Sequence, residues 1–126
     1  MIPIQILNKG AGAKLSKNLG QWEFDCRCFV DNCHFTLIDP KALAMFQSVR
    51  DKWGTPIRIR SGFRCQEHNK IVGGTPVSFH TRGMAFDLAP GSGTDLSNFY
   101  DLCTAIFSFT ILYADKGFVH CDSRFR

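Results

Sequence analysis

No stretch of this 126-residue chain approaches the ~20 consecutive apolar residues that a helix needs to cross a bilayer. The first twenty residues contain no charged segment followed by a long apolar run, so no secretory signal peptide is predicted. Internal repeats, low-complexity runs and linkers are also missing. We therefore expect a single domain over residues 1–126, synthesised in the cytoplasm, with residues 1–20 as an N-terminal arm and regular structure beginning near Trp22.

Positive charge is not concentrated in any segment. The fifteen Lys and Arg residues are scattered and the formal net charge is +4 at pH 7. A nucleic-acid binder would concentrate such charge into a basic stripe, so we expect no nucleic-acid partner, and no membrane partner either. A mild positive charge suits an acidic polymer such as a bacterial wall, and equally an ordinary basic surface.

Two segments have the pattern of amphipathic helices with local start signals. The first is residues 40–53, where Asp39 is a candidate N-cap, Pro40 occupies the first turn and Gly54 ends the helix. The second is residues 96–106, which Thr94 or Asp95 can cap.

Alternating or β-branched runs predict three strands: residues 57–60, 109–113 and 118–122, the last two joined by a turn as a hairpin. A long loop with a short helical turn is expected after the first of these strands. Two main helices and a small, largely antiparallel sheet make an α+β domain.

The chain has six cysteines, and three of them lie close together in CRCFVDNCH. Cys26, Cys28, Cys33 and His34 are donors enough for a structural zinc site. Their C-x-C-x4-C spacing does not match a common zinc knuckle, however. Because a cytoplasmic chain is reduced, we expect mostly free, buried thiols instead.

His80, Asp87 and His120 are the residue types of a catalytic zinc site. Two imidazoles and one carboxylate leave a coordination position open for water, which a closed structural site does not. Gly83 and Ala85 are small, and would let the backbone fold back so that His80 and Asp87 converge. Taken singly, each of these three polar residues could equally be a solvated or hydrogen-bonding group.

Four blocks of the sequence, in order, resemble the signature of the M15 zinc peptidases, the D-alanyl-D-alanine carboxypeptidase-like family that cuts the peptide stems of bacterial cell walls. The family pattern runs S-G-[YF]-R, N-x-x-V-G-G, S-x-H-x-x-G-x-A-x-D and V-H-x-D. This chain has SGFR at 61–64, NKIVGG at 69–74, SFHTRGMAFD at 78–87 and VHCD at 119–122. The resemblance extends over nearly the whole chain and implies the hedgehog/DD-peptidase fold.

The resemblance implies roles for several residues. His80, Asp87 and His120 would bind Zn²⁺, the implied cofactor. Arg64 would lie near the substrate's carbonyl or terminal carboxylate, with a structural arginine tied to loop carbonyls as the alternative. Ser78 would contact the substrate or cap the loop. The implied activity is a carboxypeptidase or endopeptidase acting on peptidoglycan as a monomer, and a wall-degrading endolysin of bacteriophage or prophage origin would fit.

The general base is the point at which this chain departs from the family. The best-known members place Glu or Asp three residues before the last histidine, where this chain has Gly117. Two carboxylates could replace that residue. We expect Asp122 to be the base, because it would share a strand face with His120; its alternative role is to orient His120. Asp115 is the second candidate, and it would need the turn to redirect it.

A non-catalytic module that binds the wall or signals is the main alternative function. The hedgehog signalling domain resembles these peptidases and keeps the zinc without relying on hydrolysis. Gly117 is the feature of this sequence that supports the alternative.

Overall fold

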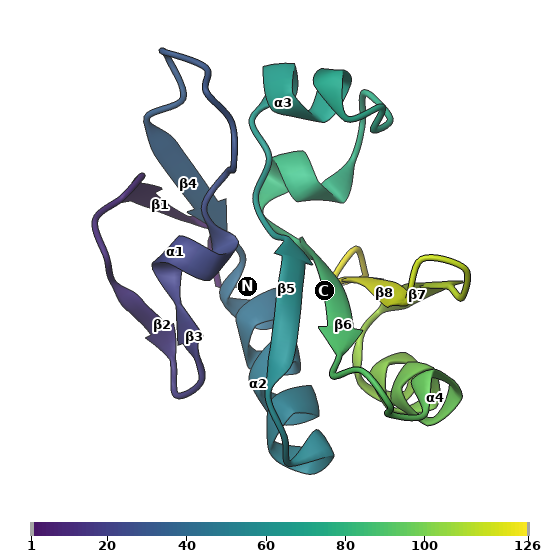
Figure 1. Ribbon diagram of the computed structural model, residues 1–126. Helices are drawn as coiled ribbons and strands as arrows, with labels where there is room; N and C mark the ends of the chain where they lie inside the picture. Colours follow the sequence, from purple (N-terminus) through teal and green to yellow (C-terminus); the bar gives the residue numbers. More distant parts are fainter. Residues whose placement is uncertain (1, 126) are drawn as a thin grey trace.

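The computed structural model describes residues 2–125 and has an α+β architecture (Figure 1). Its main sheet contains four strands, β5 (Ile57–Ser61), β6 (Ala85–Pro90), β7 (Phe109–Tyr113) and β8 (Phe118–Asp122). All neighbours are antiparallel, in the order β5-β6-β8-β7. The two long helices are α2 (Pro40–Trp53) and α4 (Leu96–Ile106), so the expected fold class is confirmed. Among the described residues, no helix has the length and apolar character needed to cross a membrane.

Local start and stop signals define both long helices. The Asp39 side chain accepts a hydrogen bond from the Lys41 backbone, and Gly54 ends α2 with φ 82°. At α4 the cap is Asp95, the second of the two candidates, whose carboxylate accepts hydrogen bonds from the backbone N–H groups of residues 97 and 98. The predicted helices are therefore confirmed at both ends.

The first twenty residues differ from the expected arm. They contain three short strands, β1 (Gln5–Asn8), β2 (Lys14–Ser16) and β3 (Leu19–Gly20). The β2 and β3 strands pair with each other, and β1 pairs antiparallel with β4 (Phe35–Ile38). Regular structure thus begins well before Trp22, because β1 is stabilised by a partner strand about thirty residues further along.

Strand β6 was also absent from the elements expected from sequence. Its first four residues are all buried, since it has a strand on each side and helices beneath it. The short elements α1 (Gln21–Phe24), α3 (Gln66–Ile71) and the 3₁₀ turn η1 (Phe79–Arg82) complete the fold. Figure 1 shows α3 beyond the end of β5, on the segment that leads from β5 to η1.

Alternation along the central strands separates the core from a polar face. On one face, Phe86 and Leu88 of β6 are completely buried, and the Phe86 ring lies 4.9 Å from that of Phe24 and 5.2 Å from that of Phe46. The opposite face of β6 carries Asp87, which is paired in register with His120 of β8. The sheet thus holds two of the candidate metal ligands side by side on a rigid support.

Candidate metal centre

The structure brings the three predicted metal ligands together from three elements. His80 comes from η1, Asp87 from β6 and His120 from β8. One carboxylate oxygen of Asp87, Oδ1, lies 3.1 Å from Nε2 of His80 and 3.2 Å from Nδ1 of His120. The ligand atoms of all three residues lie within 4.8 Å of one another. This spacing allows one small cation to contact all of them.

Gly83 makes the return from η1 to β6 possible. It has φ 72°, in the left-handed region, and a side chain there would overlap the backbone carbonyl of Leu37 in β4. The expected role of Gly83 in bringing His80 and Asp87 together therefore agrees with its conformation. Ala85 is already part of β6, where it is fully buried and faces Asp122 across the sheet.

The outer nitrogens of both imidazoles have acceptors that fix the tautomers. Nδ1 of His80 lies 2.7 Å from the carbonyl oxygen of Gly62, which can only accept a hydrogen bond. Nε2 of His120 lies 2.8 Å from Oδ2 of the Asp122 carboxylate. In neutral histidines these outer nitrogens therefore carry the protons, and the inner nitrogens direct lone pairs at Oδ1 of Asp87.

Three electron-rich atoms that face one another need a cation between them. Two imidazole lone pairs and one carboxylate oxygen repel each other unless a proton or a metal ion lies among them. Nitrogen and carboxylate oxygen are ligands that suit zinc, and the outer hydrogen bonds hold the rings in the orientation for binding. The residues present thus fit a divalent metal of this type.

Asp87 is kept ionised despite its burial. Burial by itself would raise the pKa of this carboxyl group, but the adjacent imidazoles of His120 and His80 outweigh that effect and the pKa is lowered. Its second oxygen, Oδ2, accepts a hydrogen bond from Nη2 of Arg64 at 3.1 Å. Asp87 therefore provides a negative charge at the centre of the cluster.

Arg64 is anchored by side-chain oxygens beside the cluster. Its Nε donates to the Ser61 hydroxyl at 2.9 Å, and its Nη1 donates to Oδ1 of Asn69 at 3.2 Å. Together with the bond to Asp87, these contacts use three of the five N–H groups of a guanidinium. One N–H on each terminal nitrogen remains for a ligand.

Asp122 is a partner of His120 that lies beneath the cavity surface. It is fully buried, and Arg124 binds it through Nε at 2.9 Å and Nη2 at 2.7 Å. Burial raises the pKa of Asp122, but hydrogen bonds with His120 and Arg124 outweigh burial and lower it. Strand parity did predict the contact with His120. The saturated, buried carboxylate nevertheless favours the orienting role over the role of general base.

The other sequence candidates lie around the same site. Asp115 is exposed in the turn between β7 and β8 and is not among the residues that line the cavity. Gly117 ends this turn with φ 75°, a left-handed conformation that glycine adopts more readily than an acidic residue does. Ser78 lines the cavity and its hydroxyl accepts a hydrogen bond from the His80 backbone at 3.2 Å, as expected for a residue that caps the loop.

An open cavity of about 550 Å³ lies over the cluster. Arg64, Lys116 and Arg124 contribute positive charge to its lining. Among the described residues that line it, Asp87 is the only acidic one. The cavity is therefore suited to a ligand that carries a carboxylate or develops negative charge.

Sequence reasoning missed two residues of the site. Arg124 holds Asp122, and its guanidinium lies 3.6 Å from the ring centre of Phe109. Asn69, matched only as part of a motif, is almost fully buried and bridges Arg64 to the carbonyl of Thr75. The sequence signal for Arg124 was its place as a basic residue two positions after Asp122. No local signal indicated the role of Asn69.

Comparison with protein families gives one match. A family model described as Peptidase M15 matches residues 15–122, a range that includes the three residues of the cluster as well as Arg64 and Asp122, but not Arg124. Comparison with curated proteins gives no match.

Proposed function

The chain belongs to the peptidase M15 family, and we propose that it is a zinc-dependent peptidase that hydrolyses peptide bonds in the stems or cross-links of bacterial peptidoglycan. The observation that carries this proposal is the convergence of His80, Asp87 and His120 below a cationic cavity. Family membership supports the hydrolase class.

His80, Asp87 and His120 would hold the ion. A zinc ion bound to them would supply Lewis-acid chemistry, which polarises a carbonyl group and makes water more acidic. The chain's own contribution is to fix the tautomer and the orientation of both imidazoles, through the Gly62 carbonyl and the Asp122 carboxylate.

Arg64 would bind the substrate at the oxygen where negative charge resides or develops. Its guanidinium is held in place by three side-chain contacts and keeps N–H groups available on both terminal nitrogens. A fixed fork of donors suits a carboxylate or an oxyanion. Peptidoglycan stems carry such carboxylates, and the positive charge of Lys116 and Arg124 in the cavity lining favours the same kind of ligand.

Asp122 would act through His120 and not on the substrate directly. Its burial and its bidentate contact with Arg124 support a positioning role. Ser78 would keep His80 in position from the start of η1 and border the bound peptide. Asp115, which is exposed outside the cavity lining, has no part in this proposal.

One observation favours a second candidate function, a non-catalytic module that binds the wall. Among the described residues that line the cavity, the only carboxylate is Asp87, so a separate acidic base is missing from that surface. Under this alternative the protein would bind wall peptides in the cavity without cleaving them.

Purified cell walls offer a test that separates the two functions. Zinc-loaded protein should release new amino groups from insoluble walls, and a chelator or the His80→Ala substitution should abolish that release. If the zinc-loaded protein sediments with the walls but releases no amino groups from them, the result would favour the binding module instead.

A further inference from the structure

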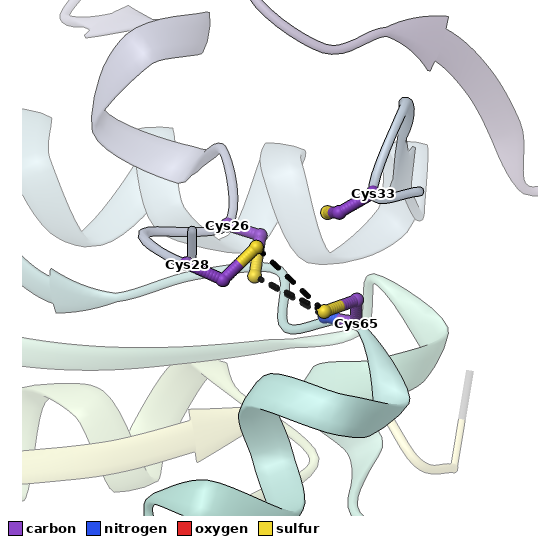
Figure 2. A group of neighbouring side chains, drawn as sticks. All are labelled: Cys26, Cys28, Cys33 and Cys65. Carbon is purple, nitrogen blue, oxygen red and sulfur yellow. Dashed lines mark hydrogen bonds between the residues drawn. The ribbon is translucent and has the colours of Figure 1, made fainter. Parts of the chain in front are cut away.

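A second group of possible metal ligands lies outside the cavity. Cys26 and Cys28 follow α1, Cys33 lies in the loop before β4, and Cys65 is the N-cap of α3. The four sulfur atoms lie within 4.8 Å of one another, and Figure 2 shows the side chains converging from these separate segments. None of the four cysteines lines the cavity. His34, the fourth donor considered from sequence, is exposed and does not belong to the group.

The spacing of the sulfur atoms matches a metal-bound arrangement better than a disulfide. Cys65 Sγ lies 3.8 Å from Sγ of both Cys26 and Cys28. In a tetrahedral site with a metal–sulfur distance of ~2.3 Å, neighbouring sulfurs are ~3.8 Å apart. A disulfide needs ~2.05 Å, and all four cysteines are free. The cluster thus has the size of a tetrathiolate site.

Neighbouring groups would stabilise negatively charged sulfur. The Cys65 backbone N–H donates to Cys26 Sγ at 3.3 Å, and the His68 backbone N–H donates to Cys65 Sγ at 3.4 Å. The Lys9 ammonium lies 3.4 Å from Cys28 Sγ and 3.5 Å from Cys33 Sγ. Four thiolates around a divalent ion leave a net charge of about −2, which these donors and the lysine offset.

Burial distinguishes this group from the other two cysteines of the chain. Only Cys26 is buried, whereas the other three are half-buried, near enough to the surface for a metal ion to enter. The remaining cysteines, Cys103 and Cys121, are completely buried and belong to the hydrophobic core. The four cysteines thus lie at the border of the core, with Cys26 inside it and the other three packed against it, where a metal ion can reach them.

We propose that the chain contains a structural zinc site, independent of the cavity and of the proposed peptidase function, whose ligands are Cys26, Cys28, Cys33 and Cys65. Four thiolates close the coordination shell, so this ion stabilises the fold and takes no substrate. It joins the loop between α1 and β4 to the start of α3. Because Cys65 directly follows Arg64, the site also fixes the segment that holds this arginine in the cavity.

Zinc content of purified variants tests the proposal. Wild-type protein, prepared with reductant, should contain two zinc ions per chain. Cys28→Ser should lose one of them while His80→Ala loses the other, and the matched control Cys103→Ala, which removes a core thiol, should keep both. If the cavity does not bind zinc, the wild type will contain one ion that Cys28→Ser loses and His80→Ala keeps. A folded Cys28→Ser protein with wild-type zinc content would overturn the proposal.

Cobalt substitution provides a second measurement that does not depend on a cysteine variant being folded. Wild-type and His80→Ala proteins loaded with Co²⁺ should both show strong sulfur-to-cobalt charge-transfer absorption in the near ultraviolet. The absence of this absorption from both cobalt-loaded proteins would contradict a tetrathiolate site. So would a disulfide between two of these cysteines that forms after the protein has been reduced and exposed to the metal.

Discussion

Asp122→Asn distinguishes the positioning role of Asp122 from the role of general base. In the native site Oδ2 accepts from His120 Nε2 and Arg124 Nη2, while Oδ1 accepts from the Arg124 backbone and Nε. An amide keeps the shape but replaces one acceptor oxygen by a donor. In either orientation one N–H donor of His120 or Arg124 then faces another donor, and the negative charge beneath the imidazole is lost.

The magnitude follows from the role of Asp122 as a partner of a metal ligand. Loss of such a partner costs about 10–100-fold in metal affinity. That range corresponds to ~1.4–2.8 kcal/mol of binding free energy. With the site refilled by excess zinc, the variant should recover most of the wild-type turnover, because Asp122 does not contact the substrate.

The assay compares zinc affinity and turnover in the same preparations. Zinc affinity is measured by competition with a coloured chelator, and the cavity site is identified as the one that His80→Ala abolishes. Hydrolysis of wall fragments is followed over the same range of zinc concentration. Asp115→Asn is the matched control, since this exposed aspartate should change neither quantity. Thermal unfolding verifies that the variants are folded.

The opposite pattern would refute the positioning role. If Asp122 were the base, Asp122→Asn would bind zinc as tightly as the wild type. Its turnover would then fall by about 10²–10⁴-fold and would not recover with added zinc.

Two other substitutions test the ligand-binding arginine and the backbone that supports the site. Arg64→Lys keeps the positive charge but loses the planar fork, so kcat/KM on wall fragments should fall about 10–100-fold while zinc content stays constant; equal activity would contradict bidentate binding. Gly83→Ala should lower the free energy of unfolding in denaturant titrations by about 3 kcal/mol or more, because a left-handed backbone and an overlap with the Leu37 carbonyl act together. Gly117→Ala has a similar φ but open space around the new methyl group, so it should cost only about 1–2 kcal/mol, and an equal loss in both variants would show that the overlap is unimportant.

Features whose causes are local could be predicted from the sequence. The long helices have capping residues next to them, as with Asp39 and Gly54, and the hairpin of β7 and β8 is formed by neighbours joined by a short turn. The three cavity ligands were also predicted, because their residue types and the family resemblance point to the same chemistry.

Features that depend on distant partners could not be predicted. Strand β1 is defined by pairing with β4, and neither strand has a strong pattern of its own. Cys65 lies far along the chain from Cys33, so the sequence suggested the neighbouring His34 as fourth donor, whereas folding brings Cys65 at the start of α3 beside the earlier loop. Parity placed Asp122 beside His120, but its burial and the clamp by Arg124 result from packing of the finished sheet.

Hydrolysis of defined peptidoglycan stem peptides by zinc-loaded wild-type protein, with every product weighed by mass spectrometry, tests the central claim most directly. The account predicts products whose summed mass exceeds that of the substrate by one water, formed with zinc and not after chelation or with His120→Ala. Intact stem peptides and cross-linked fragments after prolonged incubation with fully zinc-loaded, folded protein would contradict it.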